Sequence, residues 1–127
     1  MASNFVIKIK EALIHFFEVV KNFMKKIING ILNFAKEVIG YFKTLRLVLG
    51  KHKPFIFKPD EQFKDMVRNA PVRKVGIPFE QDKSEVIIEG VLNEETNSLE
   101  NIRYITADAL DDETKRVLGN DELVVLN

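Results

Sequence analysis

Apolar and polar positions alternate with the period of an α-helix from Asn4 to about Arg46. At about 100° per residue, the polar positions fall within one arc and an apolar arc about 220° wide lies opposite. The phase continues through Asn29-Gly30, although this dipeptide is a turn signal and glycine costs a helix interior up to about 1 kcal/mol. The pattern predicts one continuous amphipathic helix that stops near Gly50.

The pattern changes to short strands and helices after residue 50. The segment KHKPFIFKP is predicted to be extended, because each proline disfavours helix at the residue before it. Runs rich in branched side chains predict strands, and acidic residues before apolar ones predict helix starts. The expected strands cover 72–79, 85–92, 101–107 and 122–126, and the expected short helices cover 60–70 and the stretch from the cap Asp108 to Leu118, with Gly119 as the stop.

These elements predict an α+β protein, in which a long N-terminal amphipathic α-helix precedes a small antiparallel-sheet domain with two short helices. The expected division is a basic helix over 1–50 as an association element, an extended linker over 51–59, and a small acidic α+β domain over 60–127. If this division holds, removal of residues 1–50 leaves a folded monomer.

Composition and charge bear on the cellular location and on the kind of partner. The 127 residues are 46% hydrophobic, which is enough for a core, and the absence of cysteine excludes disulfides and thiolate chemistry. We therefore expect a cytoplasmic protein, with the inner face of a membrane as one place for it. Residues 1–58 hold eleven Lys or Arg and three Glu, which gives a net charge of +8. Residues 59–127 hold eight Lys or Arg and sixteen Asp or Glu, which gives −8. Such asymmetry indicates an anionic partner for the first half, which could be the acidic half itself.

The wide apolar arc predicts association with other helices, in a homo-oligomer or with a helical partner protein. An apolar arc wider than half the circumference is typical of a helix with neighbours on two sides. The predicted function is therefore that of a non-enzymatic structural or interaction protein. The expected association face consists of Phe16, Phe17, Val20, Phe23, Ile27, Ile31, Phe34, Val38 and Phe42.

An alternative is that the same helix lies in the plane of an anionic membrane surface. Bulky aromatic residues on the apolar face and basic residues at its borders are typical of such helices. The basic residues expected to contact lipid or an acidic partner are Lys8, Lys10, Lys21, Lys26 and Arg46. A monomeric membrane span is disfavoured because charges interrupt the segment, whereas a pore built from many copies is a weaker third interpretation. Nucleic acid is disfavoured, since glutamates share the polar stripe with the lysines.

No motif in the sequence predicts catalysis. His15 and His52 have no neighbouring nucleophile or carboxylate in a known pattern. The acidic run at 108–113 lacks the spacing and the glycine of a calcium loop, and helix capping accounts for it more simply. We expect no enzyme activity, no metal and no cofactor.

Overall fold

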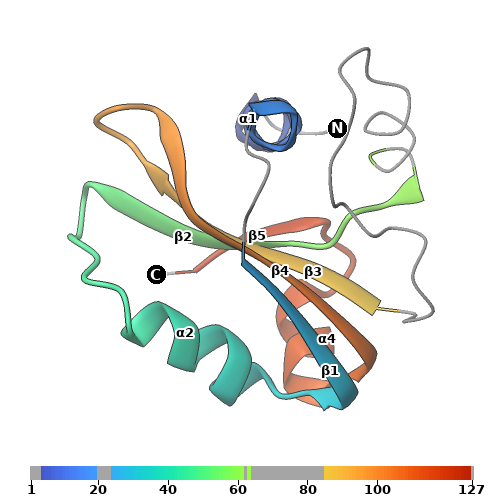
Figure 1. The fold of residues 1–127 in the computed structure, drawn as a ribbon. Helices are drawn as coiled ribbons and strands as arrows, with labels where there is room; N and C mark the ends of the chain where they lie inside the picture. Colours follow the sequence, from blue (N-terminus) through green and yellow to red (C-terminus); the bar gives the residue numbers. More distant parts are fainter. Residues whose placement is uncertain (1–3, 20–23, 62, 64–84, 127) are drawn as a thin grey trace.

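A computed structural model describes residues 4–19, 24–61, 63 and 85–126, and it places helices on both faces of a five-stranded sheet (Figure 1). In chain order the elements are α1 (Asn4–Val19), β1 (Met24–Leu32), η1 (Phe34–Ile39), α2 (Gly40–Lys43), β2 (His52–Phe57), β3 (Glu85–Asn93), β4 (Ser98–Leu110), α4 (Asp112–Leu118) and β5 (Leu123–Val125). The π-helical segment η1 continues directly into α2.

The sheet is mixed, with the strand order β1-β4-β3-β2-β5. Strands β4, β3, β2 and β5 pair antiparallel in that order, whereas β1 pairs parallel with β4. Such a parallel pair requires a crossover connection rather than a tight turn. In this strand order, β1 lies at one edge of the sheet and β5 at the other.

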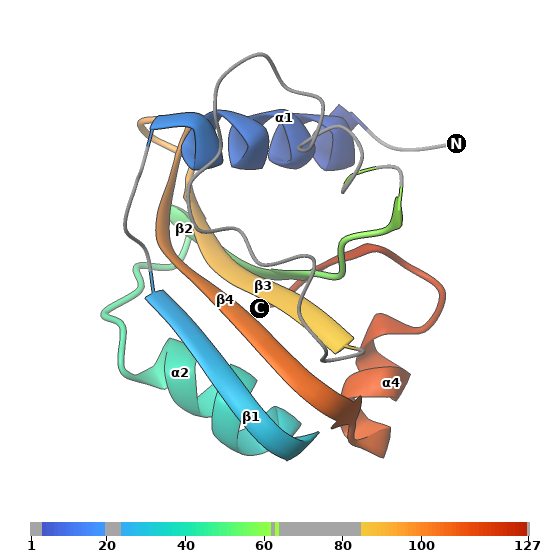
Figure 2. The same ribbon diagram turned by 45° about the vertical axis from the view of Figure 1, so that its right-hand side comes forward.

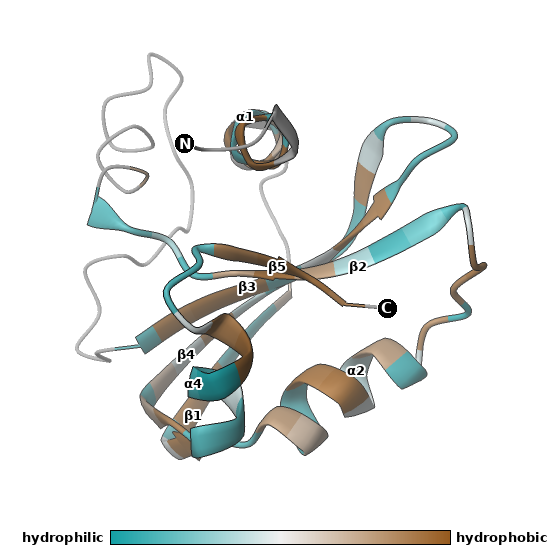
Figure 3. Cartoon of the chain, turned by 180° about the vertical axis from the view of Figure 1, so that it is seen from behind, coloured by the Kyte–Doolittle hydropathy of each residue, from teal (hydrophilic) through white to brown (hydrophobic). Residues whose placement is uncertain are grey.

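Each face of the sheet has its own hydrophobic core. On one face, α1 packs Ile9 and Leu13 against phenylalanines of β2 and residues of β3 and β4. Figure 2 shows α1 lying over this face of the sheet. On the other face, η1, α2 and α4 cover Ile56, Ile87 and Ile105 of the central strands. Because strand residues alternate between faces, one sheet supplies both cores. In Figure 3, hydrophobic stretches run along β3 and β5 between the two helical layers.

Gly90 of β3 allows close packing in the first core. A Cβ atom at this position would lie 2.3 Å from Ile102 Cδ1 and 2.8 Å from Phe55 Cζ. The strand pairing shifts register between Glu89 and Val91, so the glycine also marks an irregularity of the ladder.

The prediction of one long N-terminal helix followed by an antiparallel sheet is wrong. The helix α1 has 16 residues, and the segment after it forms β1 of a mixed sheet. The physical reason lies at Asn29-Gly30, where β1 shifts register against β4 and Gly30 has a φ of 132°. A helix cannot hold that φ, and neighbouring isoleucines favour a strand once β4 is available for pairing.

Several predictions made for residues after 50 are confirmed. Strands β3 and β4 cover the runs expected at 85–92 and 101–107, and α4 ends at Leu118 with Gly119 as its C-cap. The N-cap of α4 is Asp111 rather than Asp108. The segment expected as a linker contains β2, which lies between β3 and β5 in the sheet. The expected strand at 72–79 and most of the expected helix at 60–70 lie outside the described residues.

Candidate functional site

The helical segment η1–α2 is fixed over the sheet by hydrogen bonds at both ends. At its start, Asn33 Oδ1 accepts from the Lys36 N–H at 2.9 Å, and Asp111 Oδ2 accepts from the Phe34 N–H at 2.9 Å. Toward its end, the Tyr41 hydroxyl donates to the carbonyl of Asn101 at 2.7 Å. These bonds connect the segment to β4 and to the start of α4, and they bring Glu37 against the sheet.

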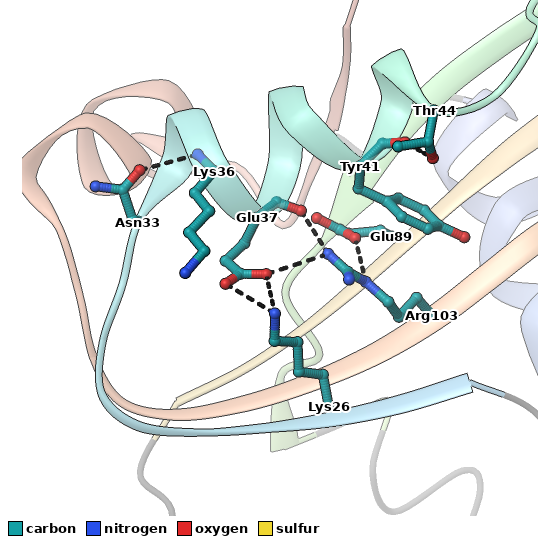
Figure 4. A network of polar contacts seen from close by, with 8 residues as sticks. All are labelled: Lys26, Asn33, Lys36, Glu37, Tyr41, Thr44, Glu89 and Arg103. Atoms are coloured by element: carbon teal, nitrogen blue, oxygen red, sulfur yellow. Dashed lines mark hydrogen bonds and ion pairs between the residues drawn. The ribbon is translucent and has the colours of Figure 1, made fainter.

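A network of charged side chains lies between η1–α2 and the sheet (Figure 4). Lys26 Nζ of β1 donates to both carboxylate oxygens of Glu37, at 2.8 and 3.0 Å. Arg103 of β4 donates through Nε to Glu89 Oε2 at 2.9 Å and through Nη2 to the carbonyl of Glu37. Lys26, Glu37, Arg103 and Glu89 thus alternate in charge across three strands and a helix, so each charged group has a neighbour of opposite charge.

Tyr41 closes this network on the side of α2. The Arg103 guanidinium carbon lies 4.2 Å from the centre of the Tyr41 ring, as in a cation–π contact. Burial raises the pKa of Tyr41, although the charge of Arg103 opposes that shift. Arg103 therefore holds three groups at once: the ring of Tyr41, the backbone of Glu37 and the carboxylate of Glu89.

Glu89 is the more deeply buried of the two carboxylates. Its exposed fraction is 0%, and no described residue gives its Oε1 a hydrogen-bond partner. Burial raises the pKa of Glu89 from 4.5 to about 7, against the opposing charge and hydrogen bond of Arg103. The carboxyl group consequently exchanges its proton near neutral pH.

A carboxyl group with a pKa near 7 is suited to general acid–base catalysis, but such a group must reach the substrate. Glu89 and Glu37 are both buried under η1–α2, and both carboxylates form ion pairs with Arg103. The ion pairs among Lys26, Glu37, Arg103 and Glu89 therefore connect η1–α2 to the sheet.

The outer edge of β1 is the most apolar exposed part of the sheet. Ile27 is 58% exposed and Ile31 is 64% exposed. Each precedes a residue that packs into the second core, Ile28 and Leu32, so both isoleucines point to the opposite face of the sheet. Among the described strands, none pairs with the outer edge of β1. Exposed apolar edge strands are templates for pairing with another strand.

The described members of the predicted association face do not share one surface. Phe34, Val38 and Phe42 are buried in the second core, and Phe16 packs partly buried against the first core. Ile27 and Ile31 are the members exposed on β1. The side chains of Phe17, Val20 and Phe23 lie outside the described residues.

The predicted basic contacts are also separated. Lys26 belongs to the charged network, and Lys10 forms an ion pair with Glu122 at 2.8 Å. Lys8 is exposed on α1, Arg46 is exposed after α2, and Lys21 lies outside the described residues.

An open concavity of about 910 Å³ lies between the start of α1, the end of β2 and the connection from α4 to β5. Its charged lining residues are Lys58, Asp60, Lys115, Asp121 and Glu122. The lining holds three carboxylates and two ammonium groups, so its charge favours no single class of ligand. Among the described residues, no group of three potential metal ligands gathers, there or elsewhere.

Sequence reasoning missed the charged network. Glu89 was visible as the one charge inside the apolar run EVIIEGVL, and Arg103 lies in NIRYITA. The two residues are register partners across β3 and β4. Pairing the ends of the two predicted strands, Leu92 with Asn101, puts Tyr104 rather than Arg103 opposite Glu89, so the observed register could not be read from the sequence. Glu37 and Lys26 were assigned to a helix.

No protein-family model, curated protein or solved structure matches this chain. What can be assigned is the fold class, an α+β protein built on a five-stranded mixed sheet. No helix in the described part of the chain is both long and apolar enough to cross a bilayer.

Proposed function

We propose that this chain is a non-enzymatic interaction protein that self-associates along the outer edge of β1. The observation that supports this proposal is the pair of exposed isoleucines, Ile27 and Ile31, on the same face of an edge strand. Fully burying an exposed isoleucine side chain contributes about 1.5–3 kcal/mol, and covering the exposed 58% of Ile27 or 64% of Ile31 contributes the corresponding fraction. An interface that covers both isoleucines in each of two copies therefore gains from four side chains.

A second copy of the chain suits this edge because antiparallel pairing about a two-fold axis is self-complementary. If the axis passes near Ile28, Ile27 of the two copies lie diagonally adjacent on one face of a continuous sheet, and Ile31 of each copy lies opposite Lys25 of the other. Lys25 and Lys26 of each copy then lie at opposite ends of the strand pair, so like charges stay apart. Parallel pairing would place the lysines of the two copies side by side.

This proposal replaces the helical association face with a strand edge but keeps the predicted class of function. A cytoplasmic location, in keeping with the absence of cysteine, stays a prediction.

The test is the mass of the purified protein in detergent-free buffer, measured by light scattering over a range of concentrations. The wild-type chain is expected to form a dimer, and the double variant Ile27→Asp/Ile31→Asp is expected to weaken dimerisation by at least about 100-fold. The control is Ile7→Asp, which places the same charge on an isoleucine of α1 that is 45% exposed. Circular dichroism would check that each variant is folded.

Two results would contradict self-association at β1. One is a wild-type chain that remains monomeric at every concentration, and the other is a double variant that dimerises as tightly as the wild type. Since the chain has no cysteine, Ile27→Cys with a short bis-maleimide gives a second readout. Cross-linked dimers are expected from Ile27→Cys but not from Ile7→Cys.

A further inference from the structure

We infer that the loop between α2 and β2 is a contact site for anionic membrane surfaces. Leu49 at its tip is 97% exposed and the preceding Val48 is 53% exposed. This tip is far along the chain from the isoleucines of β1, and the inference does not depend on self-association. Figure 3 shows the hydrophobic stretch within the connection from α2 to β2.

The tip is a defined turn. The Val48 carbonyl accepts from the N–H groups of Lys51 and His52 at 3.1 and 2.9 Å, and His52 Nδ1 accepts from the Val48 N–H at 2.8 Å. Gly50 has a φ of 87°, which suits the third position of a type II turn. Leu49 is therefore held outward at the second position of the turn.

The base of the loop is anchored while its tip is not covered by described residues. Leu45 and Leu47 pack against the second core, and the Lys51 carbonyl accepts from the Glu94 N–H at 2.8 Å. Successive side chains thus divide between the core and solvent. The exposure of Val48 and Leu49 follows from this packing and does not require a loose loop.

Basic residues flank the apolar tip on both sides in the sequence. Residues 43–53 include Lys43, Arg46, Lys51 and Lys53 and contain no Asp or Glu. Lys51 and Lys53 lie 3.8 and 3.5 Å from the carboxylates of Glu95 and Glu94, which neutralises the acidic turn beside the loop. Lys43 and Arg46 are exposed, and neither has an ion-pair partner among the described residues, so their charges remain for an anionic surface.

A lipid surface fits this shape better than a protein does. A stable protein interface covers about 800 Å² on each partner, whereas a convex turn offers two neighbouring apolar side chains. Such a tip can enter the boundary between headgroups and acyl chains, about 5–10 Å deep, while basic side chains bind the anionic headgroups. A convex apolar tip with basic side chains beside it therefore fits an anionic bilayer.

Leu49→Trp provides a direct test because the chain contains no tryptophan. Phosphatidylcholine vesicles containing phosphatidylserine are expected to shift its emission to the blue, and a brominated lipid is expected to quench it. Vesicles of phosphatidylcholine alone should give a much smaller shift. The control Ile7→Trp, on α1, should give none.

Sedimentation with the same vesicles measures how much the apolar tip and the basic side chains each contribute to membrane binding. Leu49→Asp should lower the partition of the protein onto anionic vesicles at least about tenfold, and Arg46→Glu about fivefold or more. Lys8→Glu, the same charge change on α1, should leave it unchanged. Wild-type protein that stays in the supernatant with anionic vesicles would overturn the inference, and so would equal binding by Leu49→Asp. Binding that Lys8→Glu abolishes instead would assign the lipid contact to α1.

Discussion

At the scale of single residues, Arg103 compensates the charge of the buried Glu89 carboxylate by an ion pair and a hydrogen bond. A buried carboxylate costs several kcal/mol unless it is paired, and one guanidinium here serves Glu89, Glu37 and the ring of Tyr41. Glu89 uses one oxygen for Arg103, while no described residue donates to the other. This incomplete pairing is why burial dominates the pKa of Glu89 and raises it.

The raised pKa of Glu89 predicts a specific dependence of stability on pH. Since its pKa rises from 4.5 in the unfolded chain to about 7 in the folded chain, folding takes up a proton between these values. The stabilising contribution is complete below about pH 4.5 and is lost as the pH rises through about 7. We expect the free energy of unfolding to fall by about 2–3 kcal/mol from about pH 5 to about pH 8.

Urea unfolding of the wild type and of Glu89→Gln at both pH values checks this prediction. Glutamine has a similar shape and no titrating proton, so the variant should lose this part of the pH dependence whatever its absolute stability. A variant with the same slope as the wild type would show that other groups cause the dependence. Glu85→Gln, at the half-buried start of the same strand, is the matched control.

At the scale of elements, the sequence predicted the strands whose patterns are local and unambiguous. The runs at 85–92 and 101–107 combine branched residues with a polar turn between them, and α4 has acidic residues at its start and glycine at its end. The segment of β1 was misread because apolar positions at a helical spacing also occur in a half-exposed strand with a bulge. Its branched isoleucines and Asn29-Gly30 were the contrary signals.

The candidate surfaces were predictable only in part. Ile27 and Ile31 were named from the sequence, but as members of a helical face whose other residues include buried Phe34 and Val38. Leu49 was missed, because one apolar residue beside a glycine carries no periodicity from which exposure could be read. Its exposure depends on which neighbours the second core takes up, and that is a tertiary property.

Asp111 connects two elements that are distant in the sequence, and this connection can be tested. Its Oδ1 accepts from the N–H of Thr114 at 2.8 Å as the N-cap of α4, and its Oδ2 accepts from the N–H of Phe34 at the start of η1. Burial alone would raise the pKa of Asp111, but these hydrogen bonds together lower it. Losing a cap costs about 1 kcal/mol, and leaving a second donor unpaired adds about 1–3 kcal/mol.

We therefore expect Asp111→Ala to lower the free energy of unfolding by about 2–4 kcal/mol, as measured by chemical denaturation. Asp112→Ala, in the first turn of the same helix, is the control and should cost under about 1 kcal/mol. Equal costs for the two variants would mean that Asp111 acts through its charge alone and that the bond to Phe34 contributes nothing.

At the scale of the whole molecule, the opposite charges of the two halves meet within one chain. Ion pairs between the halves join Lys10 to Glu122, Lys51 to Glu95, Lys53 to Glu94 and Lys58 to Glu85. The exposed pairs among these contribute at most about 1 kcal/mol each, so they orient the halves more than they stabilise them. The larger connection is apolar, because both cores draw side chains from before and after residue 50.

This shared core predicts that residues 51–127 do not fold alone. Removing residues 1–50 takes Ile9 and Leu13 from the first core and Leu32, Phe34, Val38 and Phe42 from the second. At about 1.5–3 kcal/mol for each buried side chain, the loss is comparable to or larger than the 5–15 kcal/mol that stabilises a typical domain. The fragment should show no cooperative unfolding transition by circular dichroism.

Cutting the intact chain at the exposed tip of the α2–β2 loop separates this prediction from a mere defect of the fragment. With a protease site inserted after Leu49, the backbone breaks while both halves of each core are already assembled. The two pieces should then co-elute in gel filtration and come apart only in denaturant, because the sheet pairs β1 with β4 across the cut. Pieces that separate in native buffer, with a folded C-terminal half, would instead establish two independent domains divided near residue 50.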